Sequence, residues 1–196
     1  FMVVHAALAV LLARLSGESD VSIGAPVAGR GEAALDDLVG MFVNTLVLRT
    51  EIDPATPFAE LVGRIRETDL AAFEHAQVPF ERLVEVLDPP RSQARHPLFQ
   101  VALFYQNLDR SGGAADRVGP DGTDSGVGDL AAPGIEPVEF DGGTARFDLQ
   151  LTLTAEFADT GYRQGMTATL DYATELFDES TVVGFAERLV RIVDAV

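Results

Sequence analysis

Three histidines are the side chains of this sequence best suited to general-base chemistry, because an imidazole gains and loses a proton near neutral pH. They are His5, His75 and His96, far apart in a chain of 196 residues. His5 lies in an apolar stretch with no carboxylate placed beside it, which favours a core or interface histidine. His75 falls at an expected helix end, where a cationic side chain favours the negative pole. His96 precedes Pro97, which predicts extended backbone and a ring able to point into a cleft.

Several other kinds of reactive site are excluded by residue type. The sequence has no cysteine, and therefore no thiolate nucleophile, disulfide or cysteine-bound zinc. All 14 basic residues are arginine, which excludes a Schiff-base or phosphate-loop lysine. No serine stands in a GxSxG elbow and no HExxH motif occurs, so neither a hydrolase triad nor a metal site is expected. The paired carboxylates Asp36 and Asp37 are typical of a solvated surface.

Composition and charge limit the partners that the chain can take. A hydrophobic fraction of 47% over this length supports one sizeable core. The formal net charge of −17 repels nucleic acid and anionic lipid, and no apolar segment is long enough to span a bilayer. We therefore expect no nucleic acid and no membrane as a partner. The chain opens on Phe1 within an apolar helical stretch, which predicts that it is cut from a longer protein.

Hydrophobic periodicity predicts an α/β fold with a mixed sheet and helices packed over at least one face. Helices are expected over residues 1–15, from Pro57 with Thr56 as its cap to about His75, from Pro79 to Asp88, and after Asp178. Strands are expected over 21–27, 42–49, 98–105, 147–157 and 162–172. The strict alternation of 147–157 predicts one wet face, and 162–172 should complete an antiparallel hairpin.

An asparagine stands at the centre of the most apolar expected strand, 42–49. A continuous run of this kind predicts a strand covered on both faces. A buried amide is costly unless its donors and acceptor are paired. Asn44 is therefore expected either to lock the local backbone or to face a polar cavity.

Residues 109–134 differ from the rest in composition, because they are rich in glycine and aspartate and poor in large apolar side chains. Such a segment cannot bury enough surface to offset the entropy of ordering it. We expect a mobile loop within the domain.

Five segments, in order along the chain, resemble the condensation domains of nonribosomal peptide synthetases. The central one is similar to the family's GxFVNTxxxR motif. The five segments are GAPVAGR at 24–30, GMFVNTLVLR at 40–49, HAQVPFE at 75–81, RSQARHPL at 91–98 and LDYATELFD at 170–178. Each match is weak alone, but five in the right order across nearly the whole chain form a specific signal.

The resemblance implies a chloramphenicol-acetyltransferase-like lobe, one of two that form a V with a tunnel between them. Carrier proteins deliver a donor thioester from one side and an acceptor thioester from the other, and an amide bond forms. The family's catalytic motif, HHxxxDG, is absent from this sequence and lies in the upstream portion of such domains. Residues 1–196 are therefore expected to be the C-terminal lobe, truncated at its N-terminus, without catalytic residues and inactive in isolation.

The resemblance also implies positions for the substrate passage, matched motif by motif. The candidates for the tunnel wall are Asn44, Thr45, Arg95 and His96. The candidates for the loop that bridges the tunnel floor are Gly24, Pro26, Gly29 and Arg30. The hairpin over 147–172 is our candidate for the second bridge between lobes, the latch.

The implied partners are the missing N-terminal lobe, peptidyl carrier proteins and an adjacent adenylation domain, all in the cytoplasm. No cofactor is expected on this chain, since phosphopantetheine is carried by the carrier domains. A lobe built to pack against another exposes an apolar face when alone, so a homodimer through that interlobe face is also expected.

Two departures from the family pattern keep other hypotheses open. Ser92 stands where the family usually has aspartate, and His96 where it usually has asparagine. A degenerate condensation-like module that recruits another protein is one alternative. The other is the lobe of an acyl-CoA-dependent acyltransferase from the same superfamily, against which the close match of the FVNT and HPLFQ segments argues.

Overall fold

The computed structural model describes residues 1–29, 38–90, 92, 95–106, 144–157 and 163–196. The elements are α1 (Met2–Ser16), β1 (Asp20–Ala28), β2 (Val43–Glu51), α2 (Phe58–Glu74), α3 (Phe80–Leu87), β3 (Val101–Gln106), β4 (Leu149–Phe157), β5 (Arg163–Tyr172) and α5 (Glu179–Asp194). The loop predicted over 109–134 lies outside the described residues.

The chain divides into two compact units. The first comprises Phe1–Tyr105, Ala145–Leu153 and Ala168–Val196, and it contains every described helix together with β1 and β2. The second comprises Gln106–Thr144 and Thr154–Thr167, and there Thr154 Oγ1 donates to Gln106 Oε1 over 3.5 Å. The residues considered below belong to the first unit.

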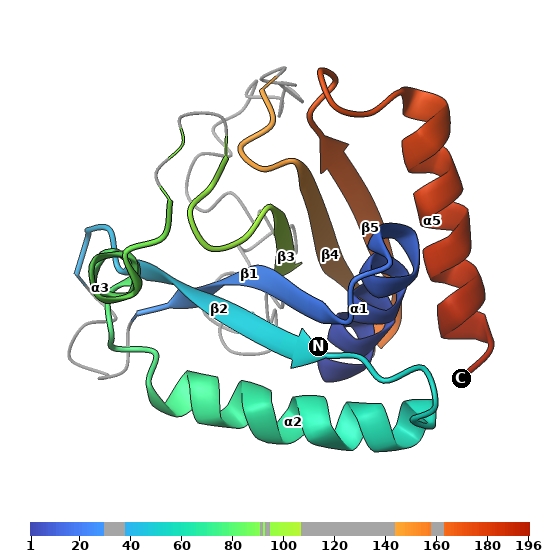
Figure 1. Ribbon diagram of the computed structural model, residues 1–196, viewed down its shortest axis with the longest axis horizontal. Helices are drawn as coiled ribbons and strands as arrows, with labels where there is room; N and C mark the ends of the chain where they lie inside the picture. The colour runs from blue at the N-terminus through green and yellow to red at the C-terminus, as the bar shows by residue number, and fades with distance from the viewer. Residues whose placement is uncertain (30–37, 91, 93–94, 107–143, 158–162) are drawn as a thin grey trace, which may run out of the picture. The chain divides into compact units, whose positions relative to one another are not determined.

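The strands form one five-stranded sheet in the order β2-β1-β3-β4-β5 (Figure 1). β1 runs antiparallel to β2, with Val27 opposite Asn44, and parallel to β3, with Ile23 opposite Val101. The sheet is therefore mixed, and the predicted α/β class is confirmed.

The two strand predictions that concerned burial had different outcomes. In β4 the leucines 149, 151 and 153 are buried in strict alternation, so the prediction of a half-buried strand is confirmed. The prediction that β2 is covered on both faces is wrong. Leu46 and Leu48 are buried, but Val43 is 58% exposed and Arg49 lies at the surface. β2 stands at the end of the strand order, and α2 and α3 are the helices that pack against it most extensively in the described structure.

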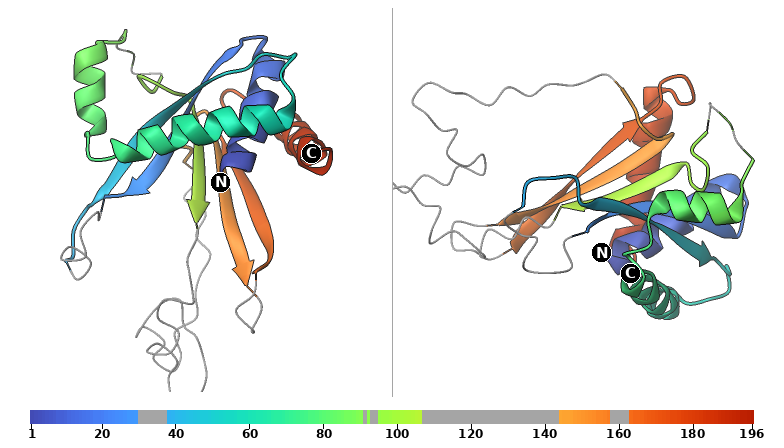
Figure 2. Two further views of the ribbon diagram at one scale, coloured as in Figure 1. Left: turned by 90° about the horizontal axis from the view of Figure 1, so that it is seen from below. Right: turned by 90° about the vertical axis from the view of Figure 1, so that its left-hand side faces the viewer.

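The helix α1 is the centre of the hydrophobic core. Its residues from Val4 to Ala9 are buried in sequence, with no wet stripe, because α1 packs against α2, α5 and β1 at once (Figures 1 and 2). The helix ends at Gly17, whose φ of 77° is the left-handed conformation expected of a glycine cap. Ile23, Leu103 and Leu151 bring the sheet into the same core cluster.

The predicted start of α2 is wrong by one residue. Pro57, rather than Thr56, occupies the capping position, with extended backbone and a carbonyl that accepts from Leu61 N at 3.0 Å. Thr56 instead closes a turn, because its amide donates to Asp53 O at 3.0 Å. The other end of α2 is as expected, since His75 is its C-terminal cap residue.

No helix among the described residues combines the length and the apolar character needed to cross a bilayer.

We predict that Gly24→Ala destabilises the fold, because a Cβ at this position would overlap the ring of Phe99. Overpacking of this kind costs about 1–3 kcal/mol. The matched control is Gly63→Ala in α2, where the new methyl group meets no atom within 4 Å. This control should raise the free energy of unfolding by about 0.5–1 kcal/mol. Urea unfolding of both variants checks the pair, and equal shifts for the two would contradict the role assigned to Phe99.

Candidate functional site

A histidine, an aspartate and a threonine from three elements form a sealed polar network. His5 Nδ1 in α1 lies 3.1 Å from Asp69 Oδ2 in α2, and His5 Nε2 lies 3.3 Å from Thr50 Oγ1 in β2. His5 and Asp69 are 0% exposed and Thr50 is 5% exposed. The expectation of a core histidine is confirmed. The expectation that no carboxylate stands beside it is wrong, because a residue 64 positions away supplies one.

The network has the order of groups found in a catalytic triad, but it cannot act on an external substrate. A general base must reach the proton that it removes, and no atom of His5 reaches solvent. Asp69 Oδ1 is buried with no hydrogen-bond partner in the described structure, so the contact of Oδ2 with His5 is what offsets the burial of this carboxylate. The arrangement is thus a structural tie between α1, α2 and β2.

A sequence signal for this network existed in α2. Leu61, Ile65 and Asp69 are spaced by four residues, which places them on one face of the helix. The first two are buried core residues, and the third shares their face. An aspartate on an apolar stripe is rarely left unpaired, so its position predicts a buried cationic or donor partner.

His96 lies in an aromatic cluster formed with Phe80, Phe99 and Phe147. Its ring centroid is 5.1 Å from that of Phe80, 4.0 Å from Phe99 and 5.5 Å from Phe147. The rings come from α3, from the segment before β3 and from the segment before β4. Phe99 is 1% exposed, whereas His96 is partly exposed, so the histidine lies at the border between this cluster and solvent.

Burial lowers the pKa of His96 below its ordinary value, and a hydrogen bond with the backbone of Phe99 opposes this shift in part. Its Nδ1 is buried and has no hydrogen-bond partner in the described part of the chain. The lowered pKa favours the neutral ring, and no carboxylate among the described residues pairs with it.

Asn44 locks the backbone, which decides between the two alternatives that the sequence left open. Its Nδ2 donates to Ala76 O at 2.8 Å and to Val78 O at 2.7 Å, and its Oδ1 accepts from Phe80 N at 3.1 Å. One side chain thus fixes the connection between α2 and α3. Because the Phe80 ring contacts His96, Asn44 also positions one wall of the aromatic cluster.

The structure brings some of the remaining candidates together. Pro26 in β1 pairs in register with Thr45 in β2, and both are half-buried. Gly24 lies against Phe99 and so against the aromatic cluster. Gly24 and Pro26 are therefore residues of a strand, rather than of the connection that follows it.

The other candidates are separate from that group. Gly29 lies so close to the Phe42 carbonyl that a Cβ would overlap it. Arg95 is exposed beside His96, and Arg30 lies outside the described residues. No group of three potential metal ligands occurs within the described ranges.

We predict that His5→Leu lowers the free energy of unfolding by about 3–5 kcal/mol, because it leaves the Asp69 carboxylate buried without a partner. The double variant His5→Leu/Asp69→Leu should recover much of this loss, since the charge is gone. Thermal and urea unfolding measure both. A double variant that is less stable than the single one would show that the unpaired carboxylate is not the cause.

We also predict that His96 makes stability fall on acidification. Because the folded state lowers its pKa, the unfolded chain takes up the proton first, near pH 6.5. The free energy of unfolding should then decrease as the pH falls below about 6.5 towards the lower pKa of the folded state. The difference between wild type and His96→Phe, from urea unfolding at pH 5 to pH 8, isolates this effect.

Comparison with known proteins assigns the family. The sequence model of the condensation domain matches residues 1–196. The chain is 43% identical to a dimodular nonribosomal peptide synthase of Bacillus subtilis and 43% identical to the isonitrile lipopeptide synthase of Mycobacterium tuberculosis. All of this chain is covered in both alignments, but only 8% and 7% of those proteins.

Solved structures agree with the sequence relatives. The X-domain from teicoplanin biosynthesis matches with a TM-score of 0.80 and 30% identity, over 99% of this chain and 40% of that one. The same X-domain in complex with OxyB gives 0.76, again at 30% identity, over 99% of this chain and 39% of that one. A four-domain nonribosomal peptide synthetase bound to AMP and glycine gives 0.79 at 26% identity, over 100% of this chain and 14% of that one. The chain belongs to the condensation-domain family of nonribosomal peptide synthetases.

Proposed function

We propose that this chain is the C-terminal lobe of a condensation domain, and that it shapes the substrate passage while the catalytic base belongs to the other lobe. The observation that carries the proposal is that no described histidine is both accessible to a substrate and paired with a carboxylate. Within the described ranges, His5 is the only histidine paired with a carboxylate, and it is completely buried. His75 caps a helix end, and His96 lies among phenylalanines without a carboxylate. The chain also spans only about two fifths of the X-domain that it matches, which is consistent with one lobe of two.

The reaction proposed for the complete domain is amide formation between two thioesters held on carrier domains. The acceptor amine attacks the donor thioester carbonyl, a C–N bond forms, the C–S bond breaks, and the thiol of the donor carrier leaves. Holding both reactants in near-attack geometry can itself supply about 7–11 kcal/mol of the barrier. The contribution of this lobe is that positioning, together with docking of the acceptor carrier.

His96, Thr45 and Arg95 remain our proposal for the passage wall. Asn44 acts indirectly, because its amide is fully engaged in fixing the connection between α2 and α3. A neutral imidazole at the border of the aromatic cluster presents a polar edge to a passage without adding charge. Gly24, Pro26, Gly29 and Arg30 remain candidates for the floor.

The proposed partners follow from the family. The relatives are large multidomain synthetases, so carrier and adenylation domains are the expected neighbours, with phosphopantetheine on the carriers. Several apolar side chains are strongly exposed, as expected for a lobe that packs against another. They include Val39 at 104%, Met41 at 89%, Val86 at 64% and Leu87 at 63% exposed. A homodimer of the isolated chain through an exposed apolar face stays a prediction.

The proposal predicts that this chain alone forms no amide bond. Donor and acceptor carrier proteins, each loaded with its thioester, are incubated with this polypeptide, and the products are read by mass spectrometry. The matched control is the complete domain, in which the same residues follow their upstream half. We expect product with the complete domain and only the uncatalysed background with this chain.

A rate above background with this chain alone would overturn the proposal, because it would require a base within residues 1–196. In the complete domain, His96→Ala should lower kcat/KM without lowering the yield of folded protein. Unchanged kinetics would remove His96 from the passage wall.

The likeness to the X-domain, which is seen in complex with OxyB, favours one second candidate, a recruitment module. On this hypothesis the complete domain binds a partner of the OxyB type and makes no peptide. A binding measurement with OxyB, made alongside the condensation assay on the same preparation, separates the two candidates. Binding without product supports recruitment, and product without binding supports the condensing role.

A further inference from the structure

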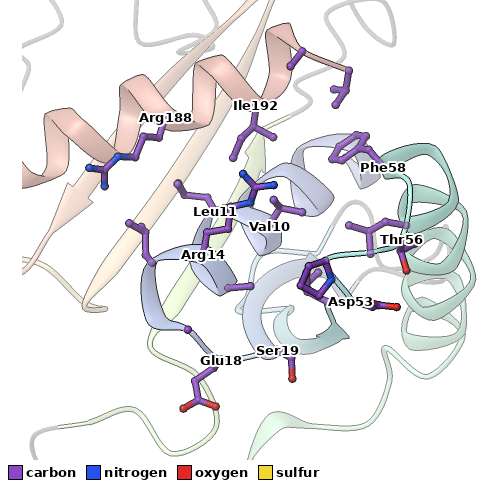
Figure 3. A pocket seen from close by; sticks show the side chains of 18 of the residues that line it. Val10, Leu11, Arg14, Glu18, Ser19, Asp53, Thr56, Phe58, Arg188 and Ile192 are labelled. Carbon is purple, nitrogen blue, oxygen red and sulfur yellow. The ribbon is translucent and has the colours of Figure 1, made fainter.

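A pocket of about 900 Å³ lies at the C-terminal ends of α1 and α5, away from the residues assigned to the passage. The segment between β2 and α2 closes its third side (Figure 3). Its volume is within the range of sites that hold small molecules. Neither the buried network nor the aromatic cluster contributes a lining residue.

The interior of this pocket is apolar. α1 supplies Val10 and Leu11, α2 supplies Phe58 and Leu61, and α5 supplies Ile192. Leu11 and Leu61 are also core residues, so the floor is fixed by the packing of the fold. An aliphatic or aromatic body is the kind of group that gains from burial against such a surface.

The rim carries three arginines, Arg14 from α1 and Arg188 and Arg191 from α5. Arg191 Nε donates to the backbone carbonyl of Glu187 at 3.2 Å. None of the three forms an ion pair with a carboxylate in the described part of the chain, and all three are exposed.

Three of the other described arginines are paired with a carboxylate, whereas Arg66, Arg95 and Arg146 form no ion pair with a described carboxylate. Arg49 pairs with Asp20, Arg64 with Glu60 and Arg82 with Glu85. In a chain with a net charge of −17 carboxylates are plentiful, yet the three arginines at this apolar pocket have no carboxylate partner among the described residues.

Two carboxylates share the rim. Asp53 already accepts a hydrogen bond from Ala55 N at 2.9 Å, and Glu18 is exposed after the end of α1. The rim thus has three cationic and two anionic side chains, and the arginines are the donors that remain available. Arginine is well suited to bind a carboxylate through two parallel hydrogen bonds.

Helix stability offers a simpler reason for arginines at this pocket. A basic side chain in the last turn stabilises a helix through its interaction with the negative pole of the helix dipole. Arg14 and Arg191 stand in the last turns of α1 and α5. That explanation concerns stability alone and gives no role to the apolar floor. The two explanations therefore differ in what they predict for ligand binding.

We propose that this pocket binds an aliphatic carboxylate, with its chain against the apolar floor and its head group held by Arg14 and Arg188. This is a binding activity separate from amide formation, and it does not depend on the proposed function. The net charge of the protein disfavours anions in general, so binding of such a ligand is a specific prediction for this site.

The test is a titration of the 196-residue chain with decanoate below its micelle concentration, followed by two-dimensional ¹H–¹⁵N NMR. We expect saturable shifts that are confined to the ends of α1 and α5 and the start of α2. Decylammonium has the same chain with the opposite charge, and it should not produce these shifts at the same concentrations. This comparison uses the wild-type protein and needs no variant to fold.

Charge reversal provides the second arm. Arg14→Glu/Arg188→Glu should weaken decanoate binding by tenfold or more, which corresponds to a loss of about 1.4 kcal/mol or more. The matched control is Arg66→Glu, which changes an exposed arginine of α2 that does not line the pocket, and it should leave affinity within twofold. The proposal is overturned by non-saturable shifts, by equal binding of decylammonium, or by a double variant that loses thermal stability while keeping the affinity for decanoate.

Discussion

The contact between His5 and Asp69 is the constraint on which the packing of this protein depends. Two polar side chains are held at 0% exposure in the middle of an apolar core, and each makes the burial of the other tolerable. Thr50 extends the contact to the sheet. Because the participants belong to α1, α2 and β2, the network fixes the angular setting of both helices against an end strand. Apolar packing alone is non-directional, whereas these hydrogen bonds admit one rotation of each helix.

A second polar tie lies just beyond the C-terminal end of α2. Asn44 takes the three backbone groups left open between α2 and α3 and so fixes where Phe80 enters the aromatic cluster. The two ties are of different kinds. The first joins side chains that are buried in the core. The second joins the side chain of Asn44 to backbone groups that follow α2. The proposed passage wall depends on the second of these ties, because Phe80 contacts His96 and Asn44 holds the backbone of Phe80.

Elements governed by local sequence could be predicted, and contacts between distant residues could not. The alternation in 147–157 predicted a half-buried strand, because it depends on neighbours in sequence. The asparagine within an apolar run left two alternatives open, a locked backbone or a polar cavity, because its partners lie 32 to 36 residues away. The site residues came from motif resemblance, and their proximity through Phe80 and Phe99 could not be predicted. The partner of His5 was missed because it lies 64 residues away, although the apolar spacing of Leu61, Ile65 and Asp69 contained a signal. The prediction that β2 is buried on both faces was wrong, because the sequence of a single strand does not reveal its place in the sheet.

The contact between Gly24 and Phe99 has a consequence for how this protein can change over time. The ring occupies the volume that any side chain on the glycine would need, so the two positions share one space. A larger residue at the first position can be accommodated only when the second becomes smaller. Substitutions at these sites should therefore be inherited in pairs, and a lineage that acquires one without the other carries a misfit until its complement arises.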